Sequence, residues 1–364
     1  MARRTSYEGD GININGIQKS SLFPNFFGPV CTGFLFLNLQ NSGSKTGPRD
    51  ISKNQFYELW RTKTDQKQSI PLLDLNIQYE PIKDRIIKKI TETFNSKYFI
   101  NGPEVQQFEE QAAAYCGTKH AIGVSSGSDA LIVSLMAFNI GHGDEVITSP
   151  FTFFATAGSI SRVGATPVFC DIDPNTFNIN PDLIESLITP QTKAIMPVHW
   201  AGRPVELRKI SKIAKKYNLK LIQDSCHAID SRYFGRSIVD FGNACTFSMH
   251  PLKNLNIWGD GGFVATNNKK LADKLYLLRN HGLINRNNSK IFAYNSRLDT
   301  IQAVVANYKL KNKLNNITKK RIKNALLFDK IFRNNSNVKT VKRFRHLKEV
   351  YHLYHINVKK RDQL

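Results

Sequence analysis

The sequence predicts an α/β protein whose core is a mainly parallel, seven-stranded sheet sandwiched between helices. Seven short apolar segments alternate with segments whose apolar residues recur every three or four positions. Apolar strands that lack polar alternation are typical of a parallel sheet covered on both faces. The length of 364 residues and the apolar content of 41% suffice for a large α/β domain and a smaller second domain.

Two amphipathic helices are expected before the first strand. In residues 82–94 the apolar side chains follow helical spacing, at Ile82, Ile86, Ile87, Ile90 and Phe94. The same spacing recurs in residues 104–115, at Val105, Phe108, Ala112 and Tyr115. Each segment therefore predicts a helix with one apolar face.

Strands and helices then alternate along the chain. The expected strands are residues 121–124, 145–148, 167–171, 194–198, 219–223, 244–248 and 262–266. The expected helices are residues 129–138, 155–163 and 205–217. This alternation is the pattern of a parallel sheet with crossover helices.

Three regions are expected from composition. Residues 1–69 have scattered Gly, Ser, Asn and Pro without a sustained period, which predicts a poorly ordered or extraneous extension. Residues 70–300 hold the alternating elements and form the large domain. Residues 301–364 begin the smaller C-terminal α+β domain.

The net charge of +22 is concentrated near the C-terminal end, where residues 300–364 carry 17 Lys and Arg against 3 Asp and Glu. The lysines alternate with apolar residues at helical spacing, so a solvated helix face explains them better than a nucleic-acid site.

No segment is long and apolar enough to cross a bilayer. Five widely spaced cysteines without a C-x-x-C pair predict neither disulfides nor a metal site, and favour a cytoplasmic location.

The first candidate site follows the strand at 121–124. Gly127 would let the backbone approach a ligand, and the start of the next helix offers unpaired N–H groups to an anion. Ser126 and Ser128 could add hydroxyl groups. A serine-rich helix cap is an equally good explanation of this segment.

The second candidate is Asp224, directly after the strand at 219–223. A carboxylate at the end of a buried strand needs a partner, because burying a lone charge is costly. It could cap a helix or pair with a cationic ring nitrogen. His227, three residues later, could donate a hydrogen bond to a ligand oxygen, and no third residue completes a metal site.

The third candidate is Lys253, in the loop between the last two strands. Most lysines lie on the surface. This one has Leu252 and Leu255 beside it and precedes a Gly-Asp-Gly-Gly turn at 259–262, which indicates a pocket. Desolvation there would lower its pKa and make its amine nucleophilic. A phosphate cradle, a strand-end Asp and a pocketed Lys together are what pyridoxal phosphate requires.

From about Ile70 to Leu364 the chain resembles the DegT/DnrJ/EryC1/StrS family of sugar-nucleotide aminotransferases, which have the fold-type-I aminotransferase scaffold. The matching strings occur in the family's order and begin at Phe99, Ser126, Gly143, Phe151, Pro197, Asp224, Phe247, Tyr294 and Gln302.

The resemblance implies a role for each matching residue. Lys253 would form the Schiff base with pyridoxal 5′-phosphate and move the proton, Asp224 would pair with the pyridine nitrogen, and His227 would lie near the ring hydroxyl. The phosphate would be bound by Ser126, Gly127, Ser128 and Ser248, with Asn295 reaching across from a second subunit of a homodimer. Phe153 would stack on the ring, with Phe151 as the second candidate and core packing as the alternative.

The implied reaction transfers an amino group from an amino acid, usually glutamate, to the keto group of a nucleotide-linked sugar for glycan biosynthesis. Sugar dehydratases on this scaffold have His in place of Lys253, so transamination is favoured over dehydration. An inactive relative that binds a partner is a further alternative.

Trp200 stands where the family usually has a smaller residue, beside the expected site. The chain stops at Leu364 where the family continues, so a truncated C-terminal domain is expected.

Overall fold

The computed structural model describes residues 74–358. The extension expected at 1–69 lies outside the described residues. The chain enters through α2 (Asn76–Tyr79) and α3 (Lys83–Ser96), followed by α4 (Pro103–Cys116). Proline at the first position of α4 and a left-handed Gly117 at its end explain the limits of that helix.

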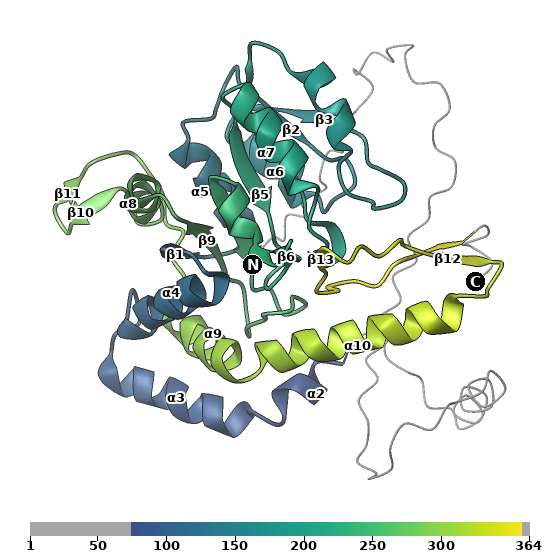
Figure 1. Cartoon of the computed structure of the whole chain (residues 1–364). Helices are drawn as coiled ribbons and strands as arrows, with labels where there is room; N and C mark the ends of the chain where they lie inside the picture. Colours follow the sequence, from purple (N-terminus) through teal and green to yellow (C-terminus); the bar gives the residue numbers. More distant parts are fainter. Residues whose placement is uncertain (1–73, 359–364) are drawn as a thin grey trace, which may run out of the picture.

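The two expected N-terminal helices are present, but only one of them is covered along its whole apolar face. In α4, Val105, Phe108 and Ala112 are buried. In α3, Ile86 is buried, whereas Phe94 is 50% exposed. The spacing of the apolar residues predicted the helix correctly. The tertiary packing, however, covers only the part of α3 that lies against α9 (Thr300–Asn312) (Figure 1).

A seven-stranded sheet forms the centre of the molecule, as predicted. Its order is β1-β9-β8-β5-β4-β2-β3. The strands are β1 (His120–Val124), β2 (Glu145–Thr148), β3 (Thr166–Phe169), β4 (Thr192–Met196), β5 (Lys220–Asp224), β8 (Ala244–Ser248) and β9 (Gly262–Thr266). All neighbours are parallel except β9, which is antiparallel to both β8 and β1. The sheet is therefore mainly parallel.

Helices cover both faces of this sheet (Figure 1). One apolar core joins the sheet to α4, α7 (Leu207–Lys216) and α9. The other face packs on α5 (Gly127–Ala137), α6 (Ala155–Arg162) and α8 (Lys269–Leu278). Because helices cover both faces, most strand positions are buried. The strands are therefore apolar runs and do not alternate with polar residues.

The C-terminal part consists of α9, the long α10 (Leu314–Phe332) and small strands. Within residues 74–358, three small antiparallel sheets lie outside the main sheet. They are β10 (Leu283–Asn285) with β11 (Asn288–Ser289), β12 (Val338–Thr340) with β14 (Ile356–Val358), and β6 (Arg232–Tyr233) with both β7 (Arg236–Ser237) and β13 (Leu347–Lys348). The 3-10 helices are Pro181–Leu183, Glu185–Leu187, Trp200–Gly202 and Ile238–Phe241. Because β13 pairs with β6, the C-terminal segment is attached directly to the large domain. The domain boundary at 300 and the truncation at Leu364 stay predictions.

None of the helices between residues 74 and 358 is long and apolar enough to cross a membrane. Over the same range, no three His, Cys, Asp or Glu side chains gather as metal ligands would.

Candidate active site

The carboxyl ends of three strands bring the predicted site residues together. Val124, Asp224 and Ser248 end β1, β5 and β8, and ligands of α/β sheets collect at this edge. Gly127, just after β1, lies so close to the other two strand ends that a Cβ there would be 2.5 Å from Ser248 Cβ. It would also be 3.1 Å from Cys226 Sγ. Segments separated by about a hundred residues thus form one compact cradle.

The start of α5 contains the serine helix cap, and its first turn also contains the backbone N–H groups that the sequence analysis considered for binding an anion. Ser126 is the N-cap, since its hydroxyl accepts a hydrogen bond of 3.0 Å from the Asp129 amide. Asp129 is itself held by the Ser296 hydroxyl, which donates to its Oδ2 at 2.9 Å. Ser128 is exposed. Even with this cap, the first turn of α5 presents amide groups to an anion.

Gly127 is the position where the cradle tolerates no side chain. Gly127→Ala is expected to weaken phosphate binding by about tenfold or more and to destabilise the fold by about 1–3 kcal/mol, because overpacking displaces neighbouring groups. Gly158→Ala is the matched control, since its Cβ would meet only the ring of Phe154, 3.0 Å away and 81% exposed. Urea unfolding and titration with cofactor would measure both effects. Equal results for the two variants would contradict a tight cradle.

Asp224 is buried but not isolated. It is 5% exposed. The Thr156 hydroxyl donates to its Oδ2 at 2.7 Å, and the Cys226 amide donates to its Oδ1 at 3.1 Å. These two donors compensate part of the cost of a buried carboxylate. Nothing in the sequence around Thr156, which lies within α6, pointed to this contact.

Lys253 lies in a turn of the β8–β9 loop, where its amide donates to the His250 carbonyl at 2.8 Å. Burial lowers the pKa of its ammonium, while the neighbouring Cys226 and Asp224 act in the opposite direction. Burial has the larger effect, so the net shift is downward, as the sequence predicted. The charge of Asp224 is therefore close enough to interact with Lys253.

His227 lies on an aromatic stack. Its ring centroid is 4.2 Å from that of His352 and 5.4 Å from that of Trp200. Burial, and then the charge of Lys253, lower the pKa of His227 well below its usual value, so the imidazole is neutral. Its Nδ1 is buried and has no partner among the described residues, so it can still bind a ligand. Trp200 lies beside the site, as expected from the sequence, whereas His352 was not predicted.

Of the two aromatic candidates, Phe151 belongs to the core and Phe153 does not. The Phe151 ring packs against Phe177 at 5.6 Å and Trp200 at 4.8 Å. Phe153 is 69% exposed and so has a free face. Asn295 is also exposed, which a residue reaching toward a second subunit requires.

His199, which belongs to one of the matching strings, serves the fold. It is fully buried, and its Nδ1 accepts a hydrogen bond of 3.1 Å from the Val205 amide. Its Nε2 must then carry the proton, which it donates to Gln223 Oε1 at 2.9 Å. Burial lowers the pKa of His199 to about 4, so it stays neutral.

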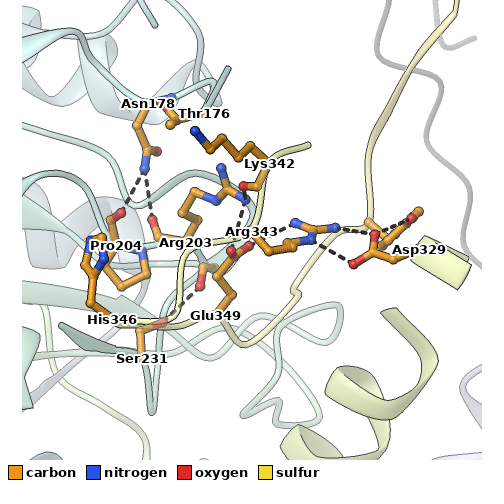
Figure 2. Close-up of polar contacts among 12 residues, drawn as sticks. Thr176, Asn178, Arg203, Pro204, Ser231, Asp329, Lys342, Arg343, His346 and Glu349 are labelled. Carbon is orange, nitrogen blue, oxygen red and sulfur yellow. Dashed lines mark hydrogen bonds and ion pairs between the residues drawn. The ribbon is translucent and has the colours of Figure 1, made fainter. Parts of the chain in front are cut away.

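A chain of ion pairs, buried at Arg203 and Glu349 and partly exposed at Arg343 and Asp329, fastens the C-terminal segment (Figure 2). Glu349 accepts from Arg203 at 3.0 Å and from Arg343 at 3.1 Å, and Arg343 also pairs with Asp329 of α10 at 3.0 Å. Beside this chain, the Val350 amide donates to the Gly202 carbonyl at 3.0 Å. The Val350 carbonyl accepts from Asn254 Nδ2, also at 3.0 Å. Asn254 directly follows Lys253, so the segment is tied to the loop of the site.

Comparison with known proteins identifies the family of this chain. The profile of the DegT/DnrJ/EryC1/StrS aminotransferase family matches residues 80–364. A "pleiotropic regulatory protein" of Geobacillus stearothermophilus is 43% identical over 298 residues, which are 81% of this chain and 80% of that protein. The UDP-N-acetyl-3-dehydro-alpha-D-glucosamine 3-aminotransferase of Acidithiobacillus ferrooxidans is 42% identical over 66% of this chain and 65% of its own length.

Solved structures agree in fold. The DesV protein of S. venezuelae, solved with a ketimine intermediate, superposes with a TM-score of 0.78 at 34% identity, covering 81% of this chain and 79% of that one. NtdA from Bacillus subtilis, solved with bound cofactor PMP, has a TM-score of 0.74 at 32% identity, covering 82% and 69%. On the strength of the family match and the shared architecture, this chain belongs to the DegT/DnrJ/EryC1/StrS aminotransferase family.

Proposed function

We propose that this chain transfers an amino group from an amino acid, most simply L-glutamate, to the keto group of a nucleotide-linked sugar. The observation that supports this most is the placement of Lys253 and Asp224, a desolvated amine and a buried carboxylate close enough to interact electrostatically. Relatives named as sugar-nucleotide aminotransferases support the substrate class. A relative named for spore coat polysaccharide biosynthesis supports a role in making glycans.

The residues present fit pyridoxal phosphate, the cofactor of the family. The cradle at Gly127 has room for a ligand only because the position lacks a Cβ. Above it, His227 keeps a buried ring nitrogen without a partner among residues 74–358. Ser126, Ser128 and Ser248 would bind the phosphate end, Asp224 would face the ring nitrogen, and Phe153 would cover the ring. When bound, the cofactor supplies an electron sink for the carbon that loses a proton.

The chain's own residues would handle the proton and the charges. Lys253 would hold the cofactor covalently between turnovers, and its free amine would remove the proton from Cα of the amino donor. In the second half-reaction it would return a proton to the sugar carbon that gains the amino group. Asp224 would keep the ring nitrogen protonated, and neutral His227 would donate to the ring hydroxyl.

The assembly we propose is a homodimer with shared sites. The exposed Asn295 would reach the phosphate of the partner's site, and the exposed Phe94 offers apolar area for the contact. We place this enzyme in the cytoplasm, because nucleotide sugars are made and used there, and we assign it no nucleic-acid or membrane partner.

The test of the activity is release of 2-oxoglutarate from glutamate in the presence of a UDP- or dTDP-linked 3-keto sugar. Production that depends on the keto sugar would support transamination. Cofactor binding without release, but with loss of water from the sugar, would identify a dehydratase-like activity. Absence of visible cofactor absorbance would identify an inactive relative.

Reduction with borohydride checks the central residue. The purified protein is expected to retain one pyridoxyl group per chain on the peptide that contains Lys253, because that amine is the desolvated one next to Asp224. Peptide mapping by mass spectrometry gives the position. Lys309, a second buried lysine, serves as the internal control and should carry no label. A label there, or at any other lysine, would remove the assignment.

A further inference from the structure

A second buried lysine, which the proposed mechanism does not use, lies behind the loop that carries Lys253. Lys309 of α9 is 4% exposed, and its ammonium donates to Oδ1 of Asn256, which is 3% exposed. No carboxylate between residues 74 and 358 forms an ion pair with it. Burial lowers the pKa of Lys309 to about 8. A dry ammonium paired only with an amide is costly, so the fold retains it for a reason other than stability.

Asn256 connects this ammonium to the loop. Its Nδ2 donates to the Pro251 carbonyl at 2.8 Å and to Gln78 Oε1 at 2.9 Å. An ammonium has only donors, so Lys309 requires the oxygen of the Asn256 amide to face it. The nitrogen of that amide must then face the Pro251 carbonyl. Lys309 thereby fixes the orientation of an amide that holds the backbone two residues before Lys253.

Helix α9 holds the same loop at a second point. Gln302 Oε1 accepts a hydrogen bond of 3.1 Å from the Trp258 amide. A Cβ at the next residue, Gly259, would lie 2.6 Å from Gln302 Nε2. Gln302 and Lys309 lie about two turns apart on α9, so the helix supports the loop at two separate places.

We propose that Lys309 is a positioning residue, which acts through Asn256 and the Pro251 carbonyl to fix the turn from which Lys253 enters the active site. The importance of that turn for catalysis rests on the proposed function, whereas its restraint by Lys309 does not. Two variants separate this role from simple packing. Lys309→Met keeps the length of the side chain without its charge. Asn256→Asp keeps the acceptor for Lys309, and strengthens it, but removes the donor to Pro251.

Hydrogen exchange of the purified enzyme, followed by mass spectrometry, tests the proposal. In Lys309→Met, peptides covering 250–258 are expected to exchange about tenfold faster than in the wild type, while peptides of β1 keep their rate, because local opening is separate from global unfolding. Asn256→Asp should give the same local increase. The control is Lys311→Met, an exposed lysine on the same helix, which should behave as the wild type.

Three results would overturn the proposal. One is a loop rate in Lys309→Met equal to that in Lys311→Met. Another is an equal increase in β1, which would indicate a general loss of stability. The third is wild-type exchange in Asn256→Asp. If borohydride fails to label Lys253 while the exchange pattern appears as expected, the proposed function fails and the restraint of the loop stands. In an active enzyme, Lys309→Met should lower kcat and leave the KM for the keto sugar unchanged.

Discussion

Lys253→Ala is expected to lower the rate of transamination by at least about 10³-fold, since it removes both the covalent attachment and the group that transfers the proton. The amine is suited to this task because burial lowers its pKa. A lower pKa means that the neutral, nucleophilic amine forms at a lower pH than it would on an exposed lysine. The measurement is the rate of 2-oxoglutarate release per enzyme molecule, with wild-type and variant enzyme at equal cofactor occupancy.

Added methylamine provides a sharper readout of the same variant. A small amine can enter the space left by the side chain and take over the proton transfer, so it should restore part of the rate to Lys253→Ala. Lys270→Ala, at an exposed position of α8, should keep the wild-type rate with or without methylamine. A Lys253→Ala enzyme that turns over like Lys270→Ala would show that another group moves the proton.

Glu349→Gln is expected to destabilise the fold by about 3–5 kcal/mol, because it leaves the buried Arg203 guanidinium without its carboxylate. The side chains of Glu349 and Arg203 are 7% and 2% exposed, and Arg343 shares the same carboxylate (Figure 2). Burial opposes the charge of Arg343, but hydrogen bonds to Asp329 and the charge of Glu349 outweigh it and raise its pKa. Arg343 keeps Asp329 as a carboxylate partner when Glu349 is replaced, whereas Arg203 does not keep its carboxylate. Urea unfolding measures the change.

The neighbouring Lys348 offers a matched control for this prediction. It pairs with Asp230 at 2.8 Å, but its side chain is 40% exposed. The Asp230 side chain is 8% exposed, but it keeps Arg232 at 4.0 Å as a second cationic partner, so Lys348→Gln should lose less stability than Glu349→Gln. If the two variants lose equal stability, the burial of the Glu349 charge is not what fastens this segment. A Glu349→Gln variant that stays folded should also show faster exchange around His352, since that residue lies three positions further along the segment.

The sequence was a good guide to the sheet, because buried parallel strands are continuous apolar runs and both faces of this sheet are covered. The strand predicted at 219–223 continues by one residue, so Asp224 is its last member. The antiparallel direction of β9 was not predicted, because strand direction depends on the path of the loop and not on side-chain pattern. For α3 the apolar period located the helix but overstated its burial, as the exposed Phe94 shows.

The roles of the candidate site residues stay predictions. Lys253, Asp224 and Gly127 were singled out because each stands at a strand end or loop and breaks the expected pattern for its position. Thr156 and His352 could not be identified, since neither breaks a local pattern and each reaches the site only through folding. Whether Asn295 enters a partner's site stays a prediction.

The amino-acid sequence by itself determined the fold class and the family, because those depend on local period and on short motifs, and it pointed to the candidate site residues. Only the tertiary structure decided which buried groups support them: Thr156 on Asp224, His352 on His227 and Lys309 behind the Lys253 loop. The physical reason is that desolvation and orientation of a polar group depend on neighbours far away in the chain, and no local pattern encodes those neighbours.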